Sequence, residues 1–122
     1  MSDHDRLIDR YIACWNEADA GRRAALVAET FAAEASYRDP MMQGEGQPGI
    51  AAMIGAAQAQ FPGLRFSRRG TVDRHNGHLR FAWSLGVPGA APAAAGTDFA
   101  TLAPDGRLAS VTGFLDAVRE AA

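Results

Sequence analysis

The chain has 122 residues, of which 48% are hydrophobic and 21% charged, and its formal net charge is −2. This length and balance predict one globular domain, spanning residues 1–122, and argue against disorder. Twelve basic residues stand against fourteen acidic ones, so no basic excess is available to neutralise a nucleic-acid backbone. The single cysteine, Cys14, excludes an intramolecular disulfide framework and a multi-cysteine zinc site.

Residues 1–17 carry several charges and lack the apolar segment of a secretory signal. No stretch of the sequence approaches the ~18 apolar residues that a membrane helix needs. We therefore expect a cytoplasmic protein whose partners include neither a membrane nor a nucleic acid. His75 and His78 have no third metal ligand at a suitable spacing, and a glycine-rich phosphate loop is missing. We accordingly expect neither a metal nor an organic cofactor.

The first half of the sequence predicts three helices and one short strand. Apolar residues at helical spacing within residues 7–15 predict the first helix, and a second, shorter helix is expected to end near Phe31. A short strand is expected at residues 35–39, followed by a glycine-containing loop at residues 41–47. A third helix is expected over residues 48–61, because its first residue is a proline, which suits the first turn.

The second half predicts a run of antiparallel strands. The first candidate strand covers residues 64–74, and the Asn76-Gly77 pair that follows is a strong signal for a tight hairpin. Residues 79–85 alternate between apolar and polar side chains, as a half-buried strand does. Two further strands are expected at residues 97–102 and 107–116, joined by a tight turn.

Helices followed by antiparallel strands are typical of an α+β fold. We expect a cone of three N-terminal helices packed on a curved antiparallel sheet. Such a cone would enclose a pocket with one open mouth, which is a natural place for a small molecule to bind.

Three polar residues stand in apolar surroundings and are the candidates for chemistry. Tyr11 lies on the apolar face of the first helix, Asp39 ends the short strand, and Asp98 lies within an otherwise apolar strand. Because burial disfavours a charged carboxylate, an enclosed Asp98 could stay protonated and donate a hydrogen bond to a developing oxyanion beside Tyr11. A better solvated Asp39 would stay ionised and could accept a proton.

Each of these residues also has a purely structural interpretation. Tyr11 could be a core tyrosine whose hydroxyl bonds to the backbone. Asp98 could lie at an exposed strand end or pair with Arg80, and Asp39 could stabilise the turn that Pro40 begins. The sequence leaves both interpretations open for all three.

Four short segments resemble those of a known family. They are Arg-Tyr-Ile-Ala-Cys-Trp-Asn at residues 10–16, Tyr-Arg-Asp-Pro at 37–40, Asp98 with Asp-Gly-Arg-Leu at 105–108, and Gly-Phe-Leu-Asp at 113–116. Over nearly its whole length the chain resembles the nuclear transport factor 2-like superfamily, in its SnoaL-like and ketosteroid-isomerase-like branch. The resemblance implies a cone of three helices against a curved antiparallel sheet, in a protein that is usually dimeric.

The resemblance also implies roles for individual residues. In ketosteroid isomerases an Asp-Pro loop supplies the general base, while a tyrosine and a protonated aspartate form the oxyanion hole. These positions fall on Asp39, Tyr11 and Asp98. The epoxide-hydrolase branch has a further aspartate where this chain has Gly113, so that reaction is not expected. Polyketide-cyclase relatives use an aspartate that Asp98 could match.

We therefore hypothesise a cofactor-free isomerase or cyclase that acts on a small apolar carbonyl compound inside the cone. The pocket is expected to be lined by Trp15, Tyr37, Phe61, Phe66, Trp83 and Val111. One alternative is a protein that binds a hydrophobic metabolite without turnover, and another is a dimeric scaffold whose cone is filled by aromatic side chains. A homodimer is expected to form through the outer face of the sheet, where strand alternation places Phe114.

Overall fold

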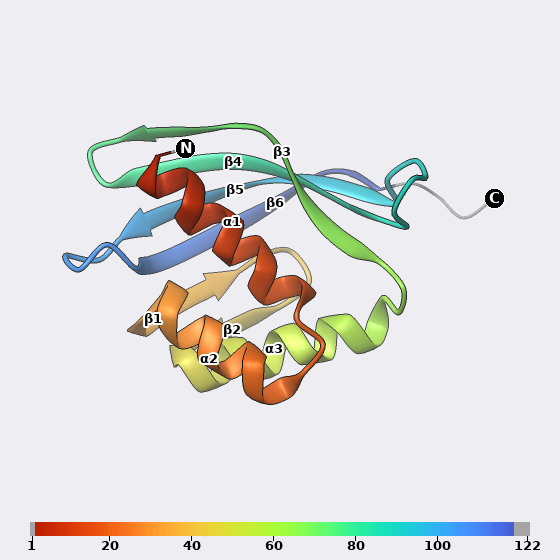
Figure 1. The fold of residues 1–122 in the computed structure, drawn as a ribbon. Helices are drawn as coiled ribbons and strands as arrows, with labels where there is room; N and C mark the ends of the chain where they lie inside the picture. Colours follow the sequence, from red (N-terminus) through yellow and green to blue (C-terminus); the bar gives the residue numbers. More distant parts are fainter. Residues whose placement is uncertain (1, 119–122) are drawn as a thin grey trace.

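Three helices lie on one side of a curved, six-stranded sheet in the computed structural model, which describes residues 2–118 (Figure 1). In chain order the elements are α1 (Asp3–Asn16), α2 (Ala20–Thr30), β1 (Phe31–Arg38), β2 (Gln43–Glu45), α3 (Gly46–Gln60), β3 (Arg65–His75), β4 (His78–Gly86), β5 (Ala94–Leu102) and β6 (Leu108–Val118). The α+β class predicted from the sequence is confirmed. None of the helices within residues 2–118 has the length and apolar character needed to cross a membrane.

Helix α1 carries the apolar face that the sequence predicts. Ser2 caps its N-terminus and forms a reciprocal capping box with Asp5, which satisfies backbone donors that the first turn leaves free. The buried side chains of the helix are Leu7, Ile8, Tyr11, Ile12, Cys14 and Trp15. Tyr11 and Trp15 are one turn apart, so both reach the interior from the same face.

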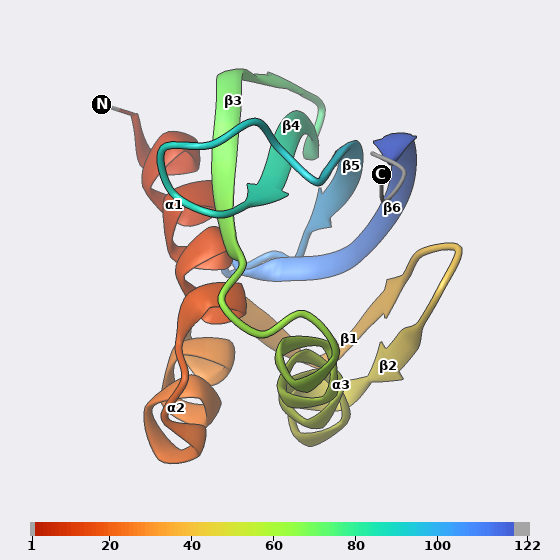
Figure 2. The ribbon, with the colours of Figure 1, turned by 90° about the vertical axis from the view of Figure 1, so that its right-hand side faces the viewer.

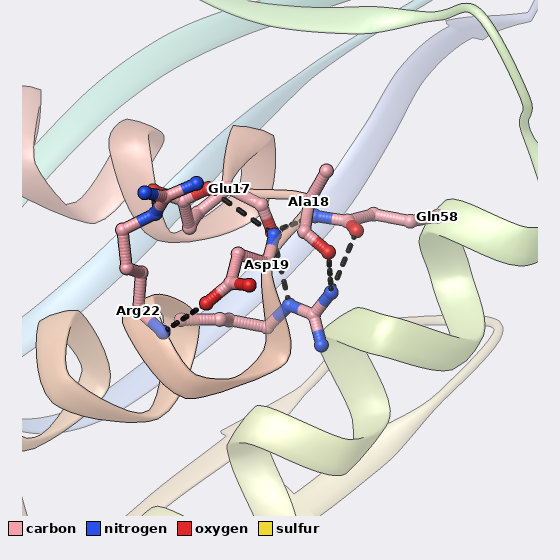
Figure 3. Close-up of polar contacts among 6 residues, drawn as sticks. Glu17, Ala18, Asp19, Arg22 and Gln58 are labelled. Atoms are coloured by element: carbon pink, nitrogen blue, oxygen red, sulfur yellow. Dashed lines mark hydrogen bonds and ion pairs between the residues drawn. The ribbon is translucent and has the colours of Figure 1, made fainter.

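The C-terminal end of α1 is tied to the other two helices by Arg23 of α2. This side chain is only 9% exposed, and its guanidinium donates to the carbonyl oxygens of Glu17 and Ala18 and to the amide oxygen of Gln58 in α3 (Figure 3). The amide nitrogen of Gln58 in turn donates to the carbonyl oxygens of Trp15 and Glu17. Carbonyl groups that a helix end leaves without partners are thereby satisfied, and the position of Trp15 is fixed.

The sheet places β6 between β1 and β5, in the order β2-β1-β6-β5-β4-β3. Strands β3 to β6 form the antiparallel run that the sequence predicts. Its first hairpin turns at Asn76 and Gly77, both with positive φ, as this tight turn type requires. Strand β1, however, pairs with β6 in parallel, so the sheet is mixed. Strand alternation predicts which face a residue occupies and carries no information about this distant pairing.

Residues 41–47, expected to form a loop, contain β2, and α3 begins at Gly46, before Pro48. The loop prediction is wrong at this point because β2 forms by pairing with β1, where Ser36 lies opposite Glu45. Strand formation here depends on the partner more than on the residues of the segment itself.

The sheet bends at interruptions in its register, and Figure 2 shows the pronounced curvature of β6. The strand pairs β3–β4, β5–β6 and β1–β6 all contain such shifts, which bend a strand and increase its twist. One of them lies at Gly96, where an added Cβ would come within 2.3 Å of the Trp83 indole. Glycine at this position lets the indole lie across β5 and point to its neighbour Asp98.

Candidate functional site

A cavity of about 270 Å³ lies between the helices and the curved sheet. A water molecule occupies ~30 Å³ in the liquid, so this space can hold a small organic molecule. Its wall is formed by Tyr11, Ile12, Trp15, Tyr37, Asp39, Met41, Met42, Ala57, Phe61, Leu64, Phe66, Trp83, Leu85, Ala93, Ala94, Asp98, Leu115 and Val118. Apolar side chains dominate this wall, and Tyr11 of α1, Asp98 of β5 and Asp39 from the turn after β1 all reach it.

Most of the residues that we expected to line a pocket are part of this wall, namely Trp15, Tyr37, Phe61, Phe66 and Trp83. Val111 is placed elsewhere: it is buried in the core. The sequence predicted one open mouth but not the residues around it. Exposed apolar side chains lie in the cavity wall, among them Met41 and Val118. They lie in a loop and at a strand end, where no periodic pattern distinguishes a cavity residue from an ordinary surface residue.

Asp98 lies in the interior, 2% exposed, and both of its carboxylate oxygens accept hydrogen bonds. The Tyr11 hydroxyl donates to Oδ2 at 2.8 Å, and the Trp83 indole nitrogen donates to Oδ1 at 2.9 Å. The structural interpretation is therefore wrong for Asp98, whereas Tyr11 does lie in the hydrophobic core and differs only in the partner of its hydroxyl. Asp98 is not at an exposed strand end, Arg80 pairs with Asp73 instead, and the Tyr11 hydroxyl bonds to a carboxylate rather than to the backbone.

Burial raises the pKa of Asp98 to about 6. The hydrogen bonds from Tyr11 and Trp83 act in the opposite direction, and the negative charge of Asp39 adds to the increase. Burial, followed by the charge of Asp98, also raises the pKa of Tyr11 well above its ordinary value. The phenol therefore keeps its proton, while Asp98 can exist in either form near neutral pH.

Asp39 lies at the other side of the cavity wall and is only partly buried. Its Oδ1 accepts hydrogen bonds from the backbone N–H groups of Met41 and Met42, at 2.8 and 2.9 Å. Its Oδ2 accepts one from the Tyr37 hydroxyl at 2.5 Å. The structural interpretation of Asp39 as a turn-stabilising residue is thus confirmed, and the same carboxylate also faces the cavity.

The two acids meet at Gly113 of β6. A Cβ added there would lie 2.9 Å from Asp98 Oδ1, 3.1 Å from Asp39 Cβ and 3.3 Å from the Tyr37 hydroxyl oxygen. The sheet explains this convergence, because Gly113 pairs directly with Asp98 on β5. On the other side β1 runs parallel to β6 and ends at Arg38, which pairs with Thr112, so that Asp39 follows beside Gly113. Glycine at this position provides the space in which the two acids and Tyr37 approach one another.

From the sequence, Gly113 was considered only as the position where the epoxide-hydrolase branch has an aspartate. A signal for its role was present, because strand alternation directs residue 113 inward and glycine inside a strand often marks a close approach of other groups. Tyr37 is also more than a wall residue. Burial and the charge of Asp98, followed by the hydrogen bond to Asp39, raise its pKa, so its hydroxyl remains a donor.

The comparisons with known proteins agree with this geometry. The family model described as a SnoaL-like domain matches residues 8–111. The crystal structure of a proposed isomerase of the SnoaL-like family from Agrobacterium tumefaciens strain C58 is 48% identical in sequence. It aligns with a TM-score of 0.90 over 96% of this chain and 100% of that one. The comparison with curated proteins finds no match.

More distant structures share the fold. A proposed SnoaL-like polyketide cyclase from Jannaschia sp. CCS1 is 17% identical and aligns with a TM-score of 0.67 over 92% of this chain and 86% of that one. A nuclear transport factor 2-like protein of unknown function from Exiguobacterium sp. 255-15 is 16% identical. Its TM-score is 0.70 over 90% of this chain and 98% of that one.

Proposed function

Because this chain belongs to the SnoaL-like domain family, we propose that its cavity binds a small apolar carbonyl compound and isomerises or cyclises it by acid–base chemistry. The observation that carries the proposal is the buried Tyr11–Asp98 pair, which faces the same apolar cavity as Asp39. The 48% identical relative described as a proposed isomerase supports the reaction class. No cofactor is needed for this chemistry.

Asp39 is the proposed base. Its carboxylate removes a proton from the carbon next to the carbonyl group. The electron pair of that C–H bond forms a C=C bond, and the π pair of the C=O bond moves onto the oxygen to give an enolate. In an isomerisation the proton returns to another carbon. In a cyclisation the enolate carbon attacks a second carbonyl carbon of the same molecule, whose oxygen takes the proton. A carboxylate has about four acceptor positions, so the three hydrogen bonds on Asp39 orient it and leave one for the proton.

Asp98 and Tyr11 are the residues proposed to stabilise the enolate. When Asp98 is protonated on Oδ2, its O–H donates to the Tyr11 oxygen, and the Tyr11 hydroxyl proton becomes free to face the cavity. The bond from Trp83 to Oδ1 is unaffected. A pKa near 6 makes this form accessible close to neutral pH. The freed hydroxyl then donates to the enolate oxygen, where negative charge develops.

Binding without turnover is the second candidate function. It is favoured by the Asp39 carboxylate, which already holds three hydrogen bonds from its own turn and Tyr37. The third interpretation, a scaffold with a filled cone, is disfavoured because Trp15, Phe61 and Trp83 surround a cavity instead of closing it.

The two functions are separated by hydrogen exchange. The cyclic ketone 1-tetralone is mixed with the protein in D2O, and deuterium uptake at the carbon next to its carbonyl is followed by NMR. We expect the wild-type protein to accelerate uptake and Asp39→Asn to lose about 10²- to 10⁴-fold of that acceleration, the usual contribution of a positioned base. Binding without acceleration would establish the second function. Acceleration that survives Asp39→Asn would contradict the role of Asp39.

The outer face of the sheet is the proposed homodimer surface. Phe99 and Phe114 are about half exposed there and meet edge to face at 6.0 Å, as the predicted outward direction of Phe114 requires. The helices lie on the opposite side of the sheet and leave this face uncovered (Figure 2). We expect the wild-type protein to sediment as a dimer and Phe114→Glu as a monomer, and a monomeric wild type would refute the dimer.

A further inference from the structure

The indole nitrogen of Trp15 is a buried donor without a partner. Within residues 2–118 it is the one buried side-chain nitrogen or oxygen that makes no hydrogen bond, and the residue is 5% exposed. Leaving such a group unsatisfied typically costs ~1–3 kcal/mol, which is why native structures hold few of them. A donor of this kind in a cavity wall points to an acceptor that comes from outside the chain.

Trp15 lies in the cavity wall beside the two tyrosines, Tyr11 and Tyr37. Its ring lines the cavity, with ring centroids 5.3 Å from Tyr37 and 6.4 Å from Tyr11. Burial and the charge of Asp98 dominate the raised pKa of Tyr11, whereas the Trp15 N–H acts on it weakly in the opposite direction. The two rings are neighbours in the cavity wall, and the Trp15 N–H does not reach hydrogen-bond geometry with the Tyr11 hydroxyl.

The other side-chain donors around the cavity acids are already engaged. The Tyr11 hydroxyl and the Trp83 indole donate to Asp98, and the Tyr37 hydroxyl donates to Asp39. Trp15 thus offers an N–H that does not have to give up an internal bond.

The indole is also held in place. Gln58 donates to the Trp15 carbonyl oxygen at 3.0 Å. The next residue, Asn16, exchanges two hydrogen bonds with the Phe66 backbone, at 2.8 and 2.9 Å. The backbone that carries the indole is therefore anchored to α3 and to β3, and a preorganised donor loses little freedom when a ligand arrives.

We propose that the Trp15 indole N–H donates a hydrogen bond to the oxygen of the bound ligand and holds that oxygen between Trp15 and the Tyr11 hydroxyl. The inference rests on the proposed function, in which the cavity takes a carbonyl compound. It makes Trp15 the residue that selects an oxygen-bearing ligand over a hydrocarbon of the same shape.

A matched pair of probes tests this role. The ketone 1-tetralone and the hydrocarbon tetralin share a carbon skeleton and differ in the carbonyl oxygen. Trp15→Phe removes the N–H and keeps an aromatic ring, so we expect about five- to tenfold weaker binding of 1-tetralone, the worth of one hydrogen bond. Tetralin should lose much less. Phe66→Leu is the control, because it trims the same wall without removing a donor and should weaken both probes alike.

NMR spectroscopy detects the proposed hydrogen bond of the Trp15 indole N–H directly. The chain has two tryptophans, so its two indole N–H signals can be assigned by their loss in Trp15→Phe. We expect 1-tetralone to shift the Trp15 signal downfield and tetralin to leave it in place. Should Trp15→Phe fold poorly, the benzothiophene analogue of tryptophan at position 15 replaces the N–H with sulfur at nearly the same shape.

The outcomes separate this inference from the proposed function. A downfield shift with ketone-selective loss of affinity supports the role of Trp15, even if 1-tetralone shows no hydrogen exchange and the catalytic proposal fails. Exchange that depends on Asp39, together with an unmoved Trp15 signal and an unchanged ketone affinity in Trp15→Phe, overturns the role of Trp15 alone. Failure of the wild type to bind either probe overturns the inference as well, because it requires a cavity that accepts this ketone.

Discussion

Two aspartates approach one cavity from opposite sides of β6, and their surroundings differ in almost every respect. Asp98 is 2% exposed and takes its hydrogen bonds from side chains far away in the sequence, Tyr11 and Trp83. Asp39 is partly exposed, and all three of its donors lie within three residues of it. One acid is thus placed by tertiary packing and the other by a local turn.

The difference shows how one fold can give two identical side chains different tasks. Burial raises the pKa of Asp98 to about 6, so its proton can be held or released near neutral pH. Asp39 remains near solvent, with its carboxylate oriented by backbone N–H groups that any sequence in the turn would supply. An acid that is placed by the whole fold should be sensitive to distant substitutions, whereas an acid held by a local turn should be less so.

The largest expected effect is on stability through Asp98→Asn. The pKa of Asp98 is raised in the folded state, so its contribution is fully present below the unfolded pKa near 4 and is lost as pH rises through about 6. An asparagine can still accept from Trp83 and donate to the Tyr11 oxygen, and it never becomes charged. Measured by chemical denaturation, the free energy of unfolding of the variant should therefore rise by about 2.5 kcal/mol relative to that of the wild type between pH 4 and pH 8.

Parallel stability curves for the two proteins across this range would show that Asp98 titrates as an ordinary surface carboxyl group. The measurement at pH 4 is the internal control. There the wild-type carboxyl group is protonated, and the remaining difference reports packing alone.

A somewhat smaller effect is expected from Gly113→Ala, which acts on both acids at once. The added methyl group would lie 2.9 Å from Asp98 Oδ1 and 3.1 Å from Asp39 Cβ, so the acids must separate. Overpacking of this kind typically costs ~1–3 kcal/mol. We expect a loss of about 2 kcal/mol in the free energy of unfolding, together with weaker binding of 1-tetralone.

Gly49→Ala is the matched control, because a Cβ at Gly49 has no atom within 4 Å and this glycine also lies in a regular element, α3. It should leave the protein as stable as the wild type or slightly more stable. Equal behaviour of the two alanine variants would mean that the acids do not converge on Gly113.

The place of each site residue on its own helix, strand or turn could be predicted from the sequence more completely than the contacts between these residues. The helical spacing that contains Tyr11, the alternation around Asp98 and the Asp-Pro turn at Asp39 are all visible in the sequence, and each residue reaches the cavity. That Tyr11 and Asp98 bond to one another depends on how α1 crosses the sheet. The resemblance to a family implied that the two form one oxyanion hole, but it did not predict this bond.

Other features of the site depend on atoms that no spacing rule describes. The bond from Trp83 to Asp98 requires the indole to cross Gly96, and the gap at Gly113 requires β1 to pair in parallel with β6. The missing partner of Trp15 becomes evident only when every buried donor is placed. Val111, assigned to the wall by its inward parity, lies deeper in the core, because parity gives the face of a strand and not the depth along it.

The smallest expected effect is that of Tyr37→Phe, which concerns the turn that holds Asp39. This change removes the hydroxyl that donates to Asp39 Oδ2 and keeps the ring that packs on Trp15. Because Asp39 is partly exposed and keeps its two backbone donors, we expect a loss of only about 1 kcal/mol in the free energy of unfolding. The amide protons of Met41 and Met42 should stay protected from hydrogen exchange, since their bonds to Oδ1 do not involve Tyr37. Asp39→Ala, by contrast, should expose both amides. If Tyr37→Phe alone released them, the turn would depend on tertiary packing as Asp98 does, and the contrast between the two acids would fail.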